Sequence, residues 1–349
     1  MEGAELTRPL AELRQADAAR FGGKSSTLGE LIAAGIPVPP GFGISTDAFR
    51  LFVAEAGLEE MIGEALARAS SGDVDVVNAA SHSIGEAMRS APVPAVVRSE
   101  VSRLYGALDD GDAPVAVRSS ALGEDSQDAT FAGQQETYLW VRGAEHVCDA
   151  VRDCWVSLCS PPAISYRARL GDAAAGEAAM GVTVQLMVDA SVSGVMFTCN
   201  PVSGDPSMIA VNASWGLGLA VVGGEVTPDD YLVSKVTREV VREHVHSKHH
   251  EYVPDPSGRG AVRVEVPAER RDARCLESES LARLVDVGRR VERYFGSRQD
   301  IEWAIERGGG LFVVQSRPVT AVAKGAEKPA KPASAIELVM GTFGAAKRD

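Results

Sequence analysis

A glycine-lysine pair near the start of the chain is the first feature that could bind phosphate. Residues 21–42 read FGGKSSTLGELIAAGIPVPPGF, and Gly23-Lys24-Ser25 is how a Walker A phosphate loop ends. That loop also needs an earlier glycine, where the chain has Ala18, and a buried apolar strand upstream, where it reads LRQADAARF. The sequence therefore excludes a P-loop. Lys24 on a glycine turn ahead of a helix can still bind phosphate through the helix N-terminus and its ammonium; the alternative is a capped turn with a solvated lysine.

An arginine at the end of a strand pattern is the second candidate. The stretch VAVRSSALGEDSQDATFAGQQETYL places Arg118 after β-branched residues and before an acidic loop that contains Gly133. A guanidinium fixed at a strand end can bind two phosphate oxygens, and a glycine loop can close over phosphates with its backbone N–H groups. The alternative is a structural arginine.

The third candidate is the stretch QDIEWAIERGGGLFVVQSRPVT. Two strand patterns joined by Arg-Gly-Gly-Gly predict a hairpin, in which alternation separates Glu302 from the apolar face that holds Trp303. Gln315 and Arg317, two residues apart, share a face of the partner strand. If Glu302 and Gln315 lie on one side, their oxygens could bind one Mg²⁺, with Arg317 neutralising the terminal phosphate. The alternative is a solvent-facing polar pair.

Helices are expected to hold Lys24 and its glycine turn in place. The pattern predicts a helix over 27–34, ended by three prolines before a strand-like GFGIST. A second helix is expected from Thr46 to about Ala56, with Thr46 as its N-cap and Asp47 in its first turn. Residues 58–109 hold two further helical patterns, broken by a Ser-Gly-Asp turn and by prolines, with no obvious chemistry.

Strand patterns dominate the rest of the chain, and we expect a mixed α+β fold rather than regularly repeated βαβ units. One strongly periodic helix is predicted over 281–295. Past residue 320 the composition becomes a Lys/Pro/Ala linker, followed by a short amphipathic segment. The predicted strands cover residues 114–120, 136–141, 182–188, 194–198, 208–214, 231–236, 261–267, 300–306 and 311–319.

Composition limits the classes of partner. The chain has 349 residues, 45% of them hydrophobic, and a net charge of −13, which predicts a globular protein of two domains with no nucleic-acid or anionic-membrane surface. Five cysteines without a C-x-x-C motif predict reduced core thiols in a cytosolic protein. No basic start with an apolar run and no long apolar stretch occurs, so we expect a cytoplasmic protein without a membrane segment.

Together these stretches resemble the ATP-binding domain of the phosphoenolpyruvate synthase and pyruvate phosphate dikinase family, which also includes rifampin phosphotransferase and the phenylphosphate and cresol phosphate synthases. The resemblance runs from about residue 21 to 320. Its motifs are GGKSSTLGEL, AVRSSALGEDS with FAGQQETYL, VSGVMFTCNPVSGD, NASWGLGLAVVGGEVTPDDY, and DIEWAI with VVQSRPVT. It implies a two-lobed ATP-grasp-like fold, with lobes over 1–180 and 181–322. Composition and helical spacing, rather than the resemblance, predict a linker and partner-docking tail over 323–349, for which a frayed tail is the alternative.

The resemblance also implies roles for particular residues. By the resemblance, Lys24, Arg118 and Arg317 make the catalytic contacts with ATP phosphates, and Glu302 and Gln315 bind Mg²⁺. The loop over the phosphates includes Gly133 and Thr137, and the adenine edge includes Gln185, Met187 and Val188. All of these side chains, drawn from both ends of the chain, are expected to converge on one magnesium-nucleotide pocket, where they position groups and neutralise charge.

Two features depart from the family's pattern. Family members pass phosphate through a histidine on a swivelling domain, in a T-x-x-G-G-x-x-x-H-like motif that this sequence lacks. Four of its six histidines form HVHSKHHE, which we interpret as an exposed loop rather than a metal site. The chain also reads Gly216-Leu217-Gly218-Leu219 where many relatives have G-L-G-E, and Val221 stands where a dinucleotide fingerprint would need its third glycine.

These features predict an ATP-binding subunit of a dikinase-type phosphotransferase, which works with a partner protein that carries the histidine. The predicted acceptor is a small molecule, with a phenol such as p-cresol preferred over pyruvate or an antibiotic. One alternative is a module that senses ATP without turnover. Another is that the chain is a piece of a longer single-polypeptide enzyme, against which the helically spaced apolar residues of 335–349 speak mildly, since they could dock on a partner.

Overall fold

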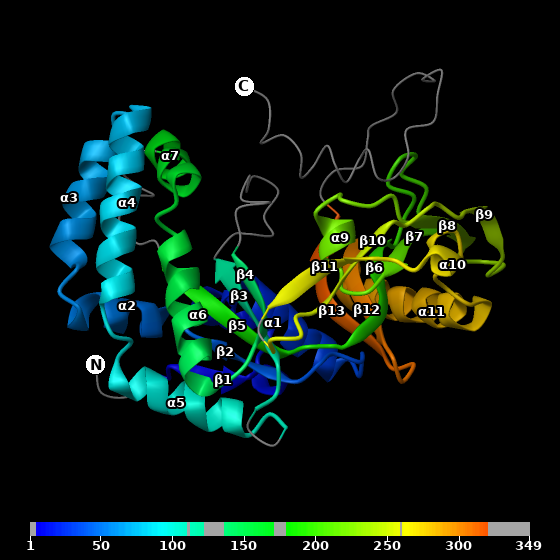
Figure 1. The fold of residues 1–349 in the computed structure, drawn as a ribbon, viewed down its shortest axis with the longest axis horizontal. Helices are drawn as coiled ribbons and strands as arrows, with labels where there is room; N and C mark the ends of the chain where they lie inside the picture. Colours follow the sequence, from blue (N-terminus) through cyan, green and yellow to red (C-terminus); the bar gives the residue numbers. More distant parts are fainter. Residues whose placement is uncertain (1–4, 110–111, 122–135, 171–178, 259, 320–349) are drawn as a thin grey trace. The chain divides into compact units, whose positions relative to one another are not determined.

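The computed structural model describes residues 5–109, 112–121, 136–170, 179–258 and 260–319. The chain forms two compact units (Figure 1). The first comprises Met1–Glu30, Pro40–Met187 and Gly258–Gly260, and the second comprises Leu31–Pro39, Val188–Ser257 and Ala261–Asp349. Helices and sheets occur in both, so the α+β prediction is confirmed. The lobe boundaries expected from the sequence stay a prediction, and residues 323–349 and Gly133 lie outside the described residues.

A five-stranded antiparallel sheet organises the first unit. Its order is β1-β2-β5-β3-β4, in which every neighbouring pair runs antiparallel. Three of the strands correspond to predicted segments, and β2 is the strand-like GFGIST, whereas β1 has only three residues and shows no alternation that a sequence pattern could detect. The bounds are β1 Thr7–Pro9, β2 Gly41–Ile44, β3 Val115–Ala121, β4 Thr137–Val141 and β5 Met180–Leu186.

Helices cover one face of this sheet and share a large apolar core with it. Phe42, Val117 and Val184 point to that face and pack in one cluster with helical residues such as Trp155. Burial of this apolar surface supplies most of the driving force for folding the unit. The helices are α2 Thr46–Glu55, α3 Glu59–Ala69, α4 Val74–Ser90, α5 Ala95–Gly106, α6 Ala144–Ser157 and α7 Pro161–Leu170.

Two predictions for these helices are wrong in detail. Residues 58–109 form three helices rather than two, because each break starts a new helix: Asp73 accepts hydrogen bonds from two backbone N–H groups of α4, and Pro94 precedes α5. The N-cap of α2 is Ser45, so Thr46 is the first helical residue. Asp47 does lie in the first turn of α2 as expected.

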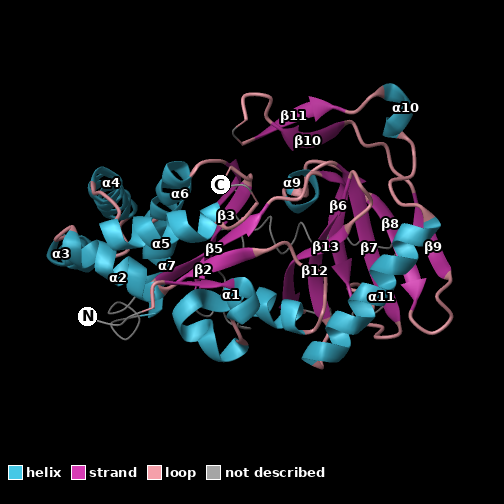
Figure 2. Cartoon of the chain, turned by 90° about the horizontal axis from the view of Figure 1, so that it is seen from below, coloured by secondary structure: helices cyan, strands magenta, loops and turns pink. Residues whose placement is uncertain are grey.

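Helix α1, Ala18–Ala33, lies on the other face of the first sheet, along β2 and β5 (Figure 2). That face is lined by small residues, including Gly43 and Gly181, and a Cβ at Gly181 would come within 2.5 Å of the backbone oxygen of Phe21. Because these glycines lack a Cβ, the helix approaches the strands closely. It is longer than the predicted 27–34 and is interrupted at Gly22.

A six-stranded antiparallel sheet organises the second unit, in the order β13-β12-β6-β7-β8-β9. The periodic helix α11, Ser278–Phe295, packs on one face, where Gly288 lies against Met196 and Ile209 (Figure 2). The sequence missed β9 and β10, since their residues, VVREH and HEYVP, do not alternate between apolar and polar. The remaining bounds are β6 Ala190–Phe197, β7 Met208–Trp215, β8 Asp229–Ser234, β9 Val240–His244, β10 His250–Pro254, β11 Ala261–Glu265, β12 Gln299–Glu306, β13 Leu311–Pro318, α9 Leu219–Val222 and α10 Ala268–Arg271.

The histidine-rich stretch is not simply an exposed loop, because Lys248 within it is fully buried. Its Nζ donates to Asp229 Oδ1 at 2.5 Å and to the carbonyl oxygen of His246 at 2.6 Å. Asp229, also fully buried, accepts further bonds from the backbone N–H groups of His246 and Cys275. Each buried charge therefore has its partners, as the cost of burying charge requires.

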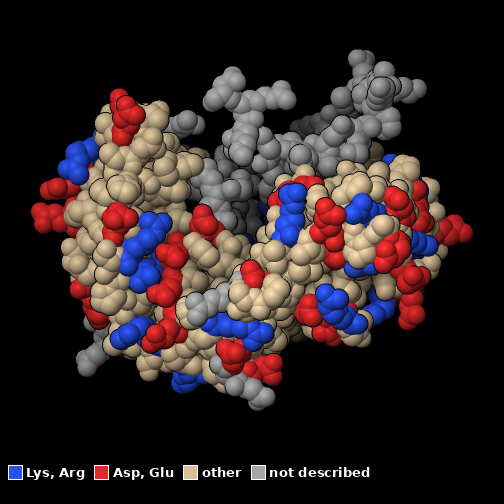
Figure 3. Space-filling view, in the orientation of Figure 1, with Lys and Arg blue, Asp and Glu red and all other residues tan. Residues whose placement is uncertain are grey.

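Further features of the surface and the thiols follow from the described residues. The five cysteines, all within the described part, are buried and form no disulfide with one another. Acidic and basic side chains are interspersed over the visible surface, with no broad basic field (Figure 3). Within the described part of the chain, none of the helices has the length and apolar character needed to cross a membrane.

Candidate functional site: a basic group and an acidic hairpin

One group of candidate residues, which we call the basic group, contains Lys24 and Arg118. It begins at a break in α1. Gly22 has φ of 80° and ψ of 163°, a conformation that favours glycine, and a Cβ there would overlap the backbone oxygen of Ser120 in β3. Any side chain at this position would therefore force the chain away from β3. The break lets the helix restart at Gly23 directly against the strand that carries Arg118.

Lys24 is held against the same strand. Only 6% of its surface is exposed, and its Nζ donates to the carbonyl oxygen of Ser119 at 2.8 Å. Next to it, Ser25 Oγ lies 2.7 Å from Thr183 Oγ1 in β5, which fixes the first turn of the restarted helix. A freely solvated lysine, the alternative left open by the sequence, is therefore wrong for Lys24.

Arg118 lies one residue from the carbonyl group that holds Lys24. In the sheet it pairs with Thr137 of β4 on one side and with Thr183 of β5 on the other. Directly paired residues of antiparallel strands carry their side chains on one face. The first unit thus brings together three of the residues expected to contact ATP phosphates: Lys24, Arg118 and Thr137.

The residues expected at the adenine edge follow one another at the end of β5. Gln185 is 2% exposed and pairs with Gly41 and Ala116. The N–H of Met187 donates to the carbonyl oxygen of Pro114 at 2.9 Å, so that donor is already used. The chain passes from the first unit to the second between Met187 and Val188.

The acidic group lies on the hairpin of β12 and β13 in the second unit. Glu302 pairs directly with Gln315, and Asp300 pairs directly with Arg317. Arg317 Nε donates to Asp300 Oδ2 at 2.9 Å, in an ion pair whose side chains are 26% and 12% exposed. The hairpin thus presents a carboxylate beside an amide and a guanidinium beside a second carboxylate.

A β-bulge decides which face of the hairpin these side chains occupy. Near the turn, Trp303 pairs with Val313, whereas Glu302 pairs with Gln315, so Val314 is the extra residue. Without this shift, Gln315 would oppose Ile301 and share the buried apolar face. The bulge therefore places Gln315 beside Glu302.

Asp300 is the residue that the sequence reasoning missed. Burial raises the pKa of Asp300, and the adjacent Arg317 opposes that rise. A signal was present in the alternation of Asp300 with Glu302, but only the strand register shows that Asp300 faces Arg317. By this contact Asp300 holds the guanidinium in a fixed orientation.

The pair Glu302 and Gln315 fits a magnesium ion. Their carboxylate and amide oxygens are hard ligands on adjacent positions of one face. Among the described residues no group of three His, Cys, Asp or Glu side chains could hold a metal alone. A pair of protein oxygens suits Mg²⁺, which usually completes its shell with water and phosphate oxygens.

The protein has a mixed α+β fold, and its two groups consist of side chains whose chemistry suits phosphate and a hard cation. Residues 18–337 match the model of the pyruvate phosphate dikinase AMP/ATP-binding domain, and the chain belongs to this family. It is thus an ATP-binding, ATP-grasp-like α+β domain of the phosphoenolpyruvate synthase type.

Several curated relatives are similar over most of this chain. It is 40% identical over 327 residues to a probable phosphoenolpyruvate synthase of Methanocaldococcus jannaschii, covering 92% of this chain and 27% of that protein. A probable phosphoenolpyruvate synthase of Methanothermobacter thermautotrophicus is 40% identical over 321 residues, covering 91% and 46%. The prodigiosin synthesizing transferase PigC of Serratia marcescens is 37% identical over 305 residues, covering 87% and 32%. The chain thus spans about a quarter to a half of these proteins.

Proposed function

We propose that the basic group and the acidic hairpin both bind one Mg-ATP and that the chain performs the nucleotide half of a dikinase reaction. The observation that carries the proposal is the buried Lys24, whose ammonium group is directed onto β3 beside Arg118. On the hairpin, Glu302 and Gln315 would hold Mg²⁺, which would neutralise phosphate charge. Arg317, oriented by Asp300, would contact the β/γ end of ATP.

The proposed reaction takes place in two steps. A histidine nitrogen attacks the β-phosphorus of ATP, the bond from that phosphorus to the α–β bridging oxygen breaks, and AMP leaves. Water then releases the γ-phosphate as inorganic phosphate, and the β-phosphoryl group stays on the histidine. In this scheme Lys24, Arg118 and Arg317 align the phosphate chain and offset its charge, while no side chain of this protein forms a covalent bond.

We propose that the histidine belongs to a swivelling domain on a separate partner protein. From that partner the phosphoryl group would pass to a small acceptor, for which we propose a phenol such as p-cresol. The names of the phosphoenolpyruvate synthases among the relatives make pyruvate the main alternative acceptor.

Position-specific labelling tests the nucleotide half. The chain would be mixed with Mg²⁺, a histidine-domain protein encoded beside its gene, and ATP labelled at either the β- or the γ-phosphorus. We expect the β-label on the partner, in an acid-labile form, and the γ-label as free phosphate. Label from the γ-position on the partner, with release of ADP, would contradict a dikinase reaction. Tight ATP binding without any consumption would favour the ATP-sensing alternative.

A separate assay tests the acceptor. The labelled partner would be isolated and offered p-cresol or pyruvate in parallel. Transfer of label to p-cresol is the expected result. Transfer to pyruvate alone would replace the phenol by the phosphoenolpyruvate synthase type of reaction, without affecting the assignment of the nucleotide half.

A further inference from the structure

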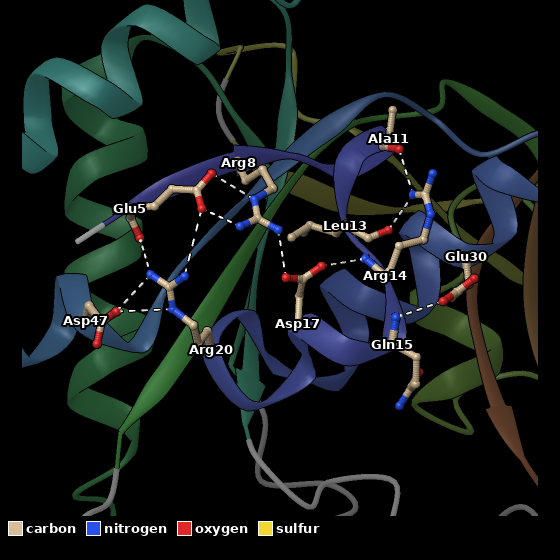
Figure 4. Close-up of polar contacts among 10 residues, drawn as sticks. All are labelled: Glu5, Arg8, Ala11, Leu13, Arg14, Gln15, Asp17, Arg20, Glu30 and Asp47. Carbon is tan, nitrogen blue, oxygen red and sulfur yellow. Dashed lines mark hydrogen bonds and ion pairs between the residues drawn. The ribbon is translucent and has the colours of Figure 1, made fainter. Parts of the chain in front are cut away.

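A network of charged side chains surrounds the start of α1 in the first unit (Figure 4). We call it the N-terminal charge network, and its members are Glu5, Arg8, Asp17, Arg20 and Asp47. Arg8 donates to Glu5 Oε1 at 2.8 Å and to Asp17 Oδ1 at 2.7 Å. Arg20 donates to Asp47 Oδ2 at 3.1 Å and to the backbone oxygen of Glu5 at 3.2 Å. The network therefore ties β1 and the beginning of α1 to α2.

Both arginines of the network cover the same aromatic ring. The guanidinium carbon of Arg8 lies 5.0 Å from the ring centroid of Phe21, and that of Arg20 lies 5.7 Å from it. The ring is fully buried, and a Cβ at Gly43 of β2 would come within 3.1 Å of it. Phe21 is thus held between two cations and the sheet, with cation–π attraction added to its burial.

Phe21 comes immediately before the break that orients Lys24. Gly22 lies so close to Ser120 that a Cβ at this position would overlap the backbone oxygen of Ser120. Lys24 follows two residues later and donates to Ser119, the residue next to Ser120. The position of the Phe21 ring therefore limits the path by which the chain reaches the Lys24 ammonium.

The sheet connects the network to the basic group a second time. Arg8 pairs with Gly43, Gly43 pairs with Thr183, and Thr183 pairs with Arg118. These residues form one row across the strands and lie on the face that α1 covers. Ser25 of α1 contacts Thr183 in the middle of the row. Arg8 and Arg118 thus occupy the same row, with the start of α1 packed between them.

The charges of the network persist at neutral pH. The hydrogen bond from Arg8 lowers the pKa of Glu5 below its ordinary value. Burial would raise the pKa of Asp17, but the Arg14 N–H and the Arg8 side chain outweigh burial and lower it. Glu5 and Asp17 are consequently ionised at the neutral pH at which ATP would bind. In this state they hold Arg8 in place over Phe21.

From this geometry we infer that Arg8 and Arg20 are positioning residues for phosphate binding: by clamping Phe21 they fix the Gly22 turn, which sets the Lys24 ammonium beside Arg118. This inference rests on the proposed function, because it assumes that Lys24 contacts ATP phosphate. It adds two residues, 16 and 4 positions before the phosphate lysine, neither of which touches nucleotide in the proposal.

The inference predicts a selective effect on phosphate recognition. Displacing Lys24 should weaken binding of ATP, whose phosphates the lysine contacts, and should leave binding of adenosine unchanged. We expect Arg8→Gln and Arg20→Gln to raise the dissociation constant of Mg-ATP about tenfold, the order of one charge-assisted hydrogen bond. Arg8→Lys keeps the cation over Phe21 and should recover part of the lost affinity.

The test measures dissociation constants of Mg-ATP and of adenosine by calorimetry for the intact chain and its variants. Arg89→Gln, which removes an ion pair to Asp153 in the same unit, is the matched control and should change neither constant. Asp17→Asn replaces only one non-hydrogen atom of the network. It takes the place of an arginine variant in the binding measurements if that variant unfolds. Thermal unfolding of each variant shows that the measured chains are folded.

The outcomes separate the inference from the proposed function. Equal loss of ATP and adenosine binding, or no loss in either arginine variant, would overturn the positioning role, provided that Lys24→Met weakens ATP binding. If Lys24→Met binds Mg-ATP as well as the natural chain does, the role of the lysine in the proposed function fails instead. A loss confined to ATP, with partial recovery in Arg8→Lys, supports the clamp.

Discussion

The ammonium group of Lys24 is almost completely buried, and one of its hydrogen bonds goes to the carbonyl oxygen of Ser119, which fixes its direction. A carbonyl dipole compensates part of the cost of burying a cation. Arg317 is held by a carboxylate, because Asp300 forms an ion pair with it within the hairpin. At the scale of single residues, the structure therefore fixes the direction of both cations, as the proposed contacts with phosphate require.

Replacing the lysine tests its part in the proposed site directly. Lys24→Met keeps the aliphatic chain and removes the charge, and we expect the dissociation constant of Mg-ATP to rise about 10- to 100-fold, the worth of a charged hydrogen bond. Calorimetry measures the change. Lys235→Met, which breaks an ion pair with Glu292 in the second unit, is the control and should leave ATP affinity near its original value. An unchanged constant in Lys24→Met would remove the lysine from the site.

Acid should weaken the N-terminal charge network. The pKa values of Glu5 and Asp17 are lowered from ordinary values of 4.5 and 3.8, so their contribution to stability is complete above about pH 4.5 and is lost as pH falls through the lower folded values. We expect the free energy of unfolding to fall with pH below about 4.5, and the fall to be smaller in Arg8→Gln. Urea unfolding between pH 7 and 3 measures it. Identical pH profiles for both chains would contradict the assignment.

At the scale of elements, the hairpin of β12 and β13 depends on its bulge. Strands in an antiparallel pair alternate strictly, so a single extra residue moves all later side chains to the other face. Here Val314 is that residue, and Gln315 and Arg317 follow it. The acidic group therefore exists because the strand register changes between Glu302 and Trp303.

The Mg²⁺ dependence of ATP binding tests the role proposed for this hairpin. Glu302→Gln keeps the shape of the side chain and removes its charge, and we expect the Mg²⁺ concentration for half-maximal ATP binding to rise about tenfold or more. Titration of Mg²⁺ at fixed ATP, followed by the fluorescence of a labelled nucleotide, measures the midpoint. Glu306→Gln, at the turn end of the same strand, is the control. Equal midpoints for both variants would exclude Glu302 as a ligand.

A second element-scale feature is the buried ion pair that joins β8 to the segment before β10. Removing one partner leaves the other charge buried without compensation, so Lys248→Met should lower the free energy of unfolding by about 3–5 kcal/mol. Urea unfolding measures the loss. Arg238→Gln, which breaks an exposed pair with Asp286, should leave the free energy nearly unchanged. Similar small losses in both variants would show that Lys248 is not buried in solution.

At the scale of the whole molecule, each unit has its own sheet and its own buried thiols. Cys148, Cys154 and Cys159 belong to the first unit, and Cys199 and Cys275 to the second. Burial raises the pKa of Cys148 to about 11 and also raises that of Cys199. Cys148 and Cys199 are thus protonated at neutral pH, and all five buried thiols can report on the opening of either unit.

Thiol labelling tests whether the five cysteines are shielded in the native chain. At pH 7 we expect the native chain to react with a thiol reagent only at the slow rate set by opening, and the denatured chain to react at all five cysteines. Absorbance of the released thiolate, with mass spectrometry of each labelled peptide, measures both rates. Rapid reaction of two or more native thiols would mean that at least one unit is not closed around its core.

Local patterns in the sequence were sufficient to predict the α+β class, most of the strands, helix α11 and the family. Periodicity and motifs are properties of neighbouring residues, and they need no knowledge of distant contacts. The charged residues of both groups, apart from Asp300, were also identified in this way, although their binding roles stay predictions. The short β1 and the charged β9 were not predicted, because neither shows a strong alternation.

Only the tertiary structure decided how these residues are held. The bond from Lys24 to Ser119 joins residues 95 positions apart, and the pair of Asp229 and Lys248 places a charge from a histidine-rich loop inside the protein. The bulge at Val314 chooses the face of Gln315 by strand register. Such contacts depend on which segments meet in space, and no local pattern of residue types specifies that.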